Sequence, residues 1–208
     1  MAKTTKPKGA TSFKETAFGI LSHSKIIPLE AEGIKKALQY IIGLSEKKAK
    51  ITPELIQNIH KVGFDFIFPD WAGQFRTIDV TVGEYEPPHY SKIAVLVKNL
   101  CDDLEERLKH IPSHEDGEQF LAEVISLLAW FQHQLVWIHP FNDYNGRVAR
   151  LLTNLLVLNF GLPVLEIKAG TGQDRQRYIN AMKAADEHNF SKLERLIANA
   201  LKENLEKT

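Results

Sequence analysis

The sequence lacks most of the features that mark specialised proteins. Its 208 residues contain one cysteine, Cys101, which excludes an intrachain disulfide framework and a zinc site made only of cysteines. Because Cys101 falls within an apolar helical pattern, we expect a buried structural thiol. There is neither an uninterrupted run of about 18 apolar residues nor a signal-peptide pattern. The sequence therefore predicts a cytoplasmic protein without a membrane span.

An excess of charge of either sign is also missing. The 26 basic residues balance 26 acidic residues, so the formal net charge is +0. This balance gives no electrostatic reason to expect a nucleic acid or an anionic membrane as a partner. Hydrophobic residues make up 44% and charged residues 25%, which is typical of a globular domain with its own core. The composition leaves a homo-oligomer open.

Strand signals are scarce. The clearest is the alternation of Ile78, Val80 and Val82 with Asp79 and Thr81, which a glycine and two prolines close. One short hairpin is the most that the sequence supports. Nearly all other segments repeat apolar residues at helical spacing, which predicts a mainly α protein. The expected helices cover residues 28–42, 52–62, 90–109, 118–137, 146–160, 174–187 and 191–201.

Composition divides the chain into three parts. Residues 1–12 are rich in Lys, Thr, Gly and Pro, and we expect a flexible tail. Residues 13–50 are predicted to be an N-terminal helical segment whose helix has Pro28 in its first turn. Residues 51–208 form the predicted core.

The stretch HPFNDYNGRVAR, residues 139–150, joins two strongly apolar helical segments. A helix N-terminus leaves backbone N–H groups unpaired and carries partial positive charge, so it can bind an anion. Asn145 and Gly146 allow a compact turn there, and the guanidinium groups of Arg147 and Arg150 can bind phosphate. These residue types predict an anion site.

Two further side chains of this stretch suit catalysis. Asp143 offers the carboxylate that Mg²⁺ commonly uses together with substrate phosphates. His139 is the side chain whose ordinary pKa suits proton transfer near neutral pH. A histidine that caps a helix and arginines that face solvent would produce the same residues at these positions. The residues alone therefore leave open both a catalytic site and a structural role.

The stretch resembles the signature of the Fic (Fido) family, H-P-F-x-[D/E]-G-N-[G/K]-R-x-x-R. The only specified position that departs from it is Tyr144, where the family has glycine. The resemblance extends to ITPELIQNIHKVGFDFIFPDWAGQFR, which ends in G-x-[FY]-R, to TIDVTVGEYEPPHYSKI and to RYINAMKAADEHNFSKLERLI. It implies a Fic-type helical bundle with one short β-hairpin flap. The matching positions are His139, Pro140, Phe141, Asp143, Asn145, Gly146, Arg147 and Arg150.

Fic enzymes mostly transfer AMP from ATP to a Ser, Thr or Tyr hydroxyl group of a protein. The resemblance therefore implies a protein adenylyltransferase with ATP as substrate, Mg²⁺ (or Mn²⁺) as cofactor and an unknown protein target, the chain itself included. Two alternatives stay open. One is transfer of another phosphate-containing group, such as UMP or phosphocholine. The other is a non-catalytic regulatory module that keeps the fold.

The resemblance also assigns roles to residues. His139 would be the general base, Asp143 would hold the metal, and Asn145 and Gly146 would line the anion hole. Arg147 would bind the β- or γ-phosphate. The nucleotide site would also include Tyr144 and Arg150. The flap, about Thr77–Tyr85, would pair with an extended target peptide through main-chain bonds. The flap residues expected to do so are Ile78, Asp79, Val80, Thr81 and Val82.

Many Fic proteins are inhibited by a helix that carries [S/T]-x-x-x-E-[G/N], whose glutamate pairs with the second arginine of the signature. Here Glu32 and Gly33 match, but Pro28 stands in place of Ser or Thr. The resemblance thus makes Glu32 the expected inhibitory residue, opposite Arg150. A glutamate near a helix N-terminus is also favoured by the helix dipole alone, so this alternative stays open.

Tyr144 raises a separate question. If the backbone there needs a positive φ, as glycine in the family suggests, a tyrosine costs about 1–2 kcal/mol. One interpretation is that the loop accepts the residue and that its ring lies beside the nucleotide or the target. The other is that the phosphate loop has been reshaped, which would change or abolish transfer. We favour the first, because the amides of Asn145 and Gly146 do not depend on the side chain at position 144.

Overall fold

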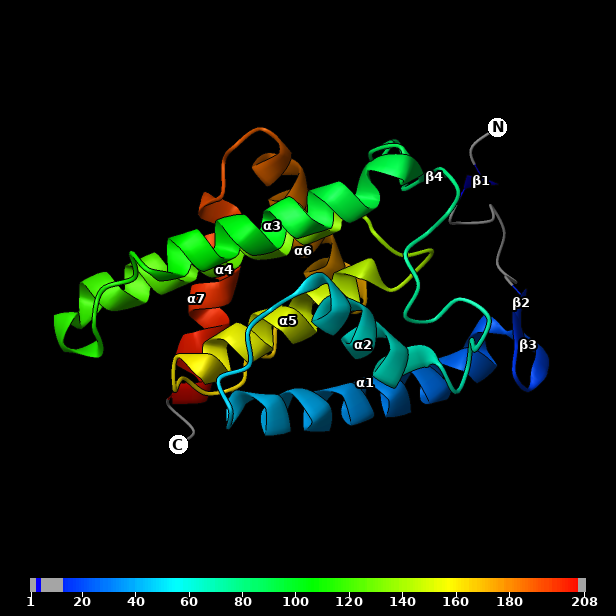
Figure 1. The fold of residues 1–208 in the computed structure, drawn as a ribbon, viewed down its shortest axis with the longest axis horizontal. Coiled ribbons are helices and arrows are strands. Elements are labelled where there is room, and N and C mark those ends of the chain that lie inside the picture. The colour runs from blue at the N-terminus through cyan, green and yellow to red at the C-terminus, as the bar shows by residue number, and fades with distance from the viewer. Residues whose placement is uncertain (1–2, 5–12, 206–208) are drawn as a thin grey trace.

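Helix α4 (Glu118–Ile138) is the central element in the computed structural model, which describes residues 3–4 and 13–205 (Figure 1). Apolar residues cover much of its circumference, so several neighbours are needed to bury it. Helices α3, α5, α6 and α7 pack against it. By length and composition α4 could cross a membrane, but half of its most apolar window is buried among these helices, as in a core helix.

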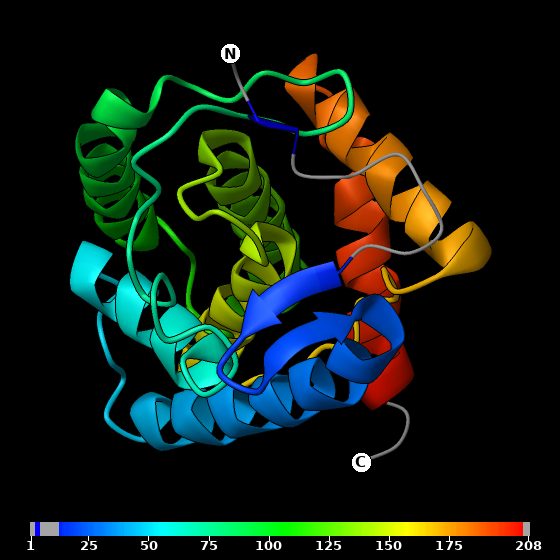
Figure 2. The same ribbon diagram turned by 90° about the vertical axis from the view of Figure 1, so that its right-hand side faces the viewer.

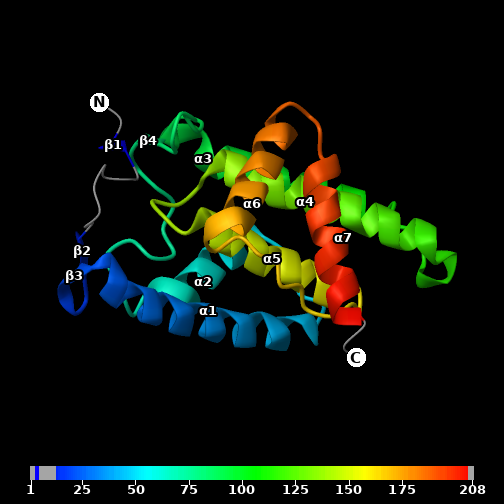
Figure 3. The same ribbon diagram turned by 180° about the vertical axis from the view of Figure 1, so that it is seen from behind.

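The helices form two groups. Figure 1 shows α1 along one side and α3 with α4 on the other, with α2 and α5 between them, while Figure 3 shows α6 and α7 side by side across α4. Two short 3₁₀ helices precede α3 and α4. The bounds are α1 His23–Ser45, α2 Pro53–Phe64, η1 Tyr90–Lys92, α3 Ile93–Leu108, η2 His114–Asp116, α5 Asn145–Asn159, α6 Gly172–Asp186 and α7 Ser191–Leu205.

The expectation of a mainly α fold is confirmed, and local signals explain where several helices begin. At the start of α2 the hydroxyl oxygen of Thr52 accepts a hydrogen bond from the amide of Leu55, and Pro53 occupies the first helical position. In α3, Cys101 is buried, which raises the pKa of its thiol to about 12. This matches the expected structural thiol.

The expected boundary at Pro28 is wrong. Helix α1 already begins at His23 and carries Pro28 inside it, and residues 13–22 are not helical. They form an antiparallel hairpin of β2 (Phe13–Thr16) and β3 (Gly19–Ser22). The Thr16 hydroxyl closes its turn, accepting from the amide of Phe18 and donating to the carbonyl of Gly19, whose φ of 86° favours glycine.

The flap contains less regular pairing than expected. Its strand β4 is only Val80–Thr81, and Val82 and Tyr85 form one further antiparallel bridge. Strand β4 pairs in parallel with β1 (Lys3–Thr4). The rest of the predicted tail, residues 1–2 and 5–12, lies outside the described residues.

Helices α1 and α2 cross at two glycines. A Cβ atom added to Gly33 would lie 1.9 Å from the carbonyl oxygen of Gly63. No side chain fits between the two backbones at this point. The crossing therefore brings α1 close to α2 and to α5, with which it also packs.

We expect Gly33→Ala to lower the free energy of unfolding, because the added methyl group would meet backbone, which cannot swing away as a side-chain tip can. Overpacking of this kind costs about 1–3 kcal/mol. Gly43→Ala in the same helix is the matched control, since its Cβ would meet nothing within 4 Å, and it should stabilise α1 by about 0.5–1 kcal/mol. Thermal unfolding followed by circular dichroism measures both. Equal stability of Gly33→Ala and wild type would contradict the close crossing.

Candidate active site

The loop between α4 and α5 begins and ends with a residue in the left-handed conformation. His139 has φ 52° and ψ 58°, and Tyr144 has φ 64° and ψ 10°. Neither is glycine, so each carries a backbone cost that its surroundings must offset. Such strain persists only where neighbouring groups fix the backbone.

Asn145 and His60 fix the loop from inside. The side chain of Asn145, which is buried, accepts from the amide of Phe141 (2.8 Å) and donates to its carbonyl (2.9 Å). The ring of Phe141 stacks on His60, with centroids 3.9 Å apart. His60 accepts from the amide of Gly73 at Nδ1 (2.9 Å) and donates from Nε2 to the carbonyl of Asp143 (3.3 Å). Burial lowers the pKa of His60 to about 4, so its ring is neutral near pH 7.

Arg76, the last residue of the GQFR segment, fixes the loop to the flap. The residue is 2% exposed. Its guanidinium donates to the carbonyls of His139 (2.8 Å), Ile78 (2.9 Å) and Pro88, and its amide donates to the carbonyl of Pro140 (2.8 Å). One buried cation thus joins the segment before β4, the segment before α3 and the start of the loop.

His139 is held in one tautomer. Its Nδ1 lies 3.3 Å from the carbonyl oxygen of Val136, which can only accept, so Nδ1 carries the hydrogen. Nε2 of the neutral ring is then free to accept a proton. Burial lowers the pKa of His139 to about 4, and the nearby Arg76 adds to this. The imidazole is therefore neutral near pH 7, as a general base must be.

The N-terminus of α5 presents the expected amides. Among the hydrogen bonds of residues 13–205, none uses the amides of Asn145 and Gly146, whereas those of Arg147 and Val148 donate to the carbonyl of Tyr144 (2.9 and 3.0 Å). Two free amides at a helix N-terminus can bind an anion. The Asn145 side chain, in contrast, holds the loop through both its oxygen and its nitrogen.

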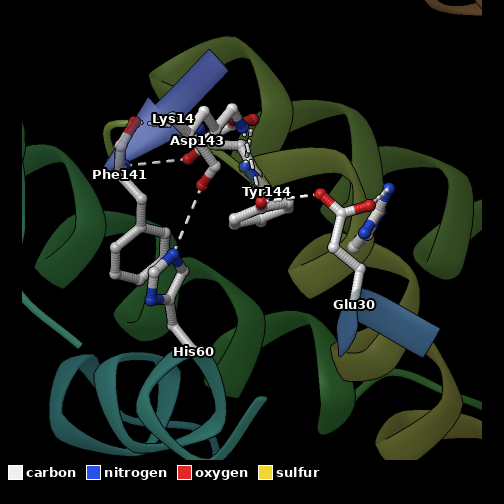
Figure 4. A network of polar contacts seen from close by, with 8 residues as sticks. Lys14, Glu30, His60, Phe141, Asp143 and Tyr144 are labelled. Carbon is white, nitrogen blue, oxygen red and sulfur yellow. Dashed lines mark hydrogen bonds and ion pairs between the residues drawn. The ribbon is translucent and has the colours of Figure 1, made fainter. Parts of the chain in front are cut away.

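Helix α1 reaches this N-terminus through Glu30 (Figure 4). The Glu30 side chain is 3% exposed. Its Oε1 accepts from the hydroxyl of Tyr144 and its Oε2 from Nη2 of Arg147, each at 2.7 Å. Both hydrogen bonds are charge-assisted, because the acceptor is a carboxylate.

The expected contact between Glu32 and Arg150 is not present. Glu32 is exposed and pairs with Lys36 at 2.8 Å. Two positions along an α-helix correspond to a rotation of about 200°, so Glu30 and Glu32 point to nearly opposite sides of α1. The glutamate that faces the loop is Glu30, and its arginine is Arg147.

Arg150 lies on the same side of α5 but makes other contacts. Its guanidinium lies over the ring of Tyr178, 5.4 Å from the centroid. Arg147 and Arg150 also line a cavity of about 440 Å³ between α1, α5 and residues 164–167. Arg150 is therefore available to a ligand in that cavity.

The ring of Tyr144 lies inside the core, and the residue is 6% exposed. It stacks on Phe64 at the end of α2, with centroids 4.1 Å apart and planes 10° apart, and it also contacts Phe68 and Trp71. Burial, followed by the hydrogen bond to Glu30, raises the pKa of its hydroxyl, which stays protonated and donates. Aromatic packing thus offsets the strain of the left-handed backbone.

Asp143 does not fit the expected metal in this arrangement. Its Oδ1 accepts from the amide of Tyr144 (2.7 Å), and its Oδ2 pairs with the ammonium group of Lys14 in β2 (2.5 Å). Nothing in the sequence pointed to Lys14, which lies 129 positions away.

The expected flap residues lie next to this loop but differ in exposure. Val80 is buried, whereas Ile78 is exposed. Asp79 accepts from the amide of Tyr90 (2.9 Å), and the hydroxyl of Tyr85 donates to the carbonyl of Trp137 at the end of α4 (2.8 Å). The backbone of Val80 and Thr81 is the part that pairs with another strand.

The comparisons with known proteins agree with the fold and the loop. A curated relative from Aedes aegypti, named protein adenylyltransferase Fic, is 31% identical over 186 residues, which is 88% of this chain and 34% of the relative. The chain thus spans about a third of that relative's length. Fic-1 (residues 134–508) from C. elegans is 25% identical with a TM-score of 0.66, over 84% of this chain and 48% of that one.

A second solved structure matches over nearly its whole length. The N-terminal Fic domain of Bep8 from Bartonella sp. 1-1C has a TM-score of 0.67 at 20% identity and covers 94% of this chain and 93% of its own. This similarity shows that the chain has the fold of a Fic domain. The model of the Fic/DOC family matches residues 50–157, more than half of the sequence, including the loop and most of α5. The chain belongs to the Fic/DOC family.

Proposed function

We propose that this chain transfers AMP from ATP to a Ser, Thr or Tyr hydroxyl group of a protein, itself included. The observation that carries the proposal is the arrangement around the loop. A neutral histidine with a free Nε2, two free amides and an arginine all belong to residues 139–147. The name of the curated relatives, protein adenylyltransferase, supports AMP as the transferred group.

The chemistry follows from these groups. Nε2 of His139 accepts the proton of the target hydroxyl group while the hydroxyl oxygen forms a bond to the α-phosphorus of ATP. The bond from that phosphorus to the bridging oxygen breaks, and pyrophosphate leaves. The amides of Asn145 and Gly146 donate to phosphate oxygens at the positive end of α5, and Arg147 binds the terminal phosphates. Positioning and charge neutralisation account for most of the catalysis in such a transfer.

The flap supplies the surface for the target. Strand β4 already accepts a strand, because Lys3 and Thr4 pair with Val80 and Thr81. This pairing supports the proposal that an extended peptide binds here through its backbone, in place of β1. Main-chain pairing would make few demands on the sequence around the modified hydroxyl group.

Helix α1 restrains the reaction in this proposal. Glu30 occupies the guanidinium of Arg147 that the terminal phosphates need, and its negative charge repels them. Removing Arg147 from Glu30 is unfavourable by itself, because a buried carboxylate without a charged partner is costly. ATP must therefore displace Glu30, or α1 must move, before the phosphates reach Arg147.

We expect His139→Ala to lower transfer by about 10²–10⁴-fold, since the general base is lost. The assay incubates the protein with labelled ATP, UTP, GTP or CTP, and with a labelled phosphocholine donor in a separate arm. It is best run in a Glu30→Gln background, so that inhibition does not hide the loss. His110→Ala, which changes an exposed histidine, is the control. Transfer that survives in His139→Ala would contradict the base assignment, and a preference for another donor would contradict AMP.

The pH dependence should reflect the low pKa of His139. A general base acts in its unprotonated form, and burial lowers this pKa from 6.5 to about 4. The initial rate of transfer should stay level as the pH falls from about 8 to about 5 and should decline only as the pH nears 4. Rates measured across this range test the expectation. An inflection at the ordinary histidine value would show that the base is exposed during the reaction.

Glu30→Gln should raise nucleotide affinity and self-modification by roughly 10–100-fold, because removal of the charge releases Arg147 from a charge-assisted bond. Isothermal titration with an ATP analogue and label incorporation measure the two effects. Glu32→Gln is the matched control on the same helix and should change neither, since Glu32 pairs with Lys36 on the surface. Equal responses of the two variants would remove the inhibitory role of Glu30.

A further inference from the structure

The Asp143 carboxylate already holds a cation. The ammonium group of Lys14 lies 2.5 Å from Oδ2, and the other oxygen is occupied by the amide of Tyr144. A divalent ion bound to this carboxylate would be repelled by the ammonium group of Lys14. The arrangement places a fixed positive charge where the family resemblance implies a metal.

Lys14 is held there by more than the ion pair. Its Nζ lies over the ring of Tyr144, 4.9 Å from the centroid, and 5.6 Å from the centroid of Phe68. These cation–π contacts favour an ammonium group at this spot. The side chain approaches Asp143 beside Tyr144 (Figure 4). Lys14 therefore has three separate reasons to stay in place.

The strand that carries Lys14 is also anchored. The hairpin of β2 and β3 lies across the end of the bundle (Figure 2) and leads directly into α1, and the amide of Ala17 in its turn donates to the carbonyl of Ile67 (2.9 Å). The backbone that carries Lys14 is consequently anchored to the bundle.

The ammonium group still has capacity for a ligand. It has three N–H donors. One is directed at Asp143, and a second is near the hydroxyl of Tyr144, at 3.4 Å. The side chains of Lys14 and Asp143 are 31% and 41% exposed, so an anion can approach. The free amides of α5 begin two residues after Asp143.

We propose that Lys14 replaces the divalent cation in this chain. Asp143 orients its ammonium group, which binds the phosphates of the nucleotide together with the α5 amides and Arg147. Nucleotide then binds without a metal. The proposal rests on the proposed function only in taking a nucleotide as the ligand, and it concerns binding, which is measurable without transfer.

The test measures the affinity for a non-hydrolysable ATP analogue by isothermal titration, in EDTA and in Mg²⁺. Wild type should bind equally well in both. Lys14→Met should lose about 10–100-fold in EDTA, the value of a charge-assisted hydrogen bond, and Mg²⁺ should restore part of the loss because Asp143 is released. Lys14→Arg should keep the binding in EDTA. Lys35→Met, which removes an exposed lysine from α1, should match wild type.

Mn²⁺ provides a readout that involves no activity. Electron paramagnetic resonance should detect Mn²⁺ bound with the analogue to Lys14→Met, but not to wild type or to the double variant Lys14→Met/Asp143→Asn. Binding of Mn²⁺ to wild type through Asp143, or unchanged affinity of Lys14→Met in EDTA, would overturn the proposal. If neither wild type nor Glu30→Gln binds nucleotide under either condition, this proposal and the proposed function both fail. Binding without any transfer of AMP in Glu30→Gln contradicts only the latter.

Discussion

A buried carboxylate needs partners, and the arrangement of the site depends on how Glu30 finds them. The carboxylate is almost inaccessible, so each oxygen must accept a strong hydrogen bond. Tyr144 and Arg147 supply these bonds. They can do so only because α1 lies close to α2 and α5, and the contact of Gly33 with Gly63 permits that approach. A packing detail one helical turn from Glu30 thus determines what the loop between α4 and α5 meets.

The loop itself is positioned by groups from several elements. Arg76 binds its first carbonyl, His60 of α2 binds that of Asp143, and Asn145 closes the loop on Phe141. With so many fixed contacts, two left-handed residues can be kept without glycine. The result is a loop whose amides and histidine are already oriented before any ligand arrives, which reduces the reorganisation that binding would otherwise require.

The sequence predicted the parts of this arrangement that depend on local pattern. Apolar periodicity located the helices from α2 onward, the Thr52–Pro53 pair located the start of α2, and the signature located the loop. The family motif pointed to Glu32 and not to Glu30, because the side of α1 that faces the loop is set by the glycine crossing, which is a tertiary contact. The hairpin at residues 13–22 was not predicted, since its turn depends on one threonine hydroxyl and one glycine.

No pattern in the sequence predicted the contacts between distant segments. Lys14 and Asp143 meet only because the hairpin folds back over the end of the bundle, and His60 is placed by its helix rather than by a motif. Tyr144 was visible as a departure from the signature, but its burial was not, because the aromatic residues that enclose it come from α2 and the segment after it.

The buried ring of Tyr144 has a consequence for engineering. The loop cannot simply be replaced by the corresponding loop of a relative. A grafted loop with glycine at position 144 would leave a cavity beside Phe64. It would also deprive Glu30 of one donor and Lys14 of one of its two aromatic neighbours. Such a graft would need a larger side chain from α2 and a new donor for Glu30. Position 144, α1 and the hairpin therefore have to be exchanged as one unit.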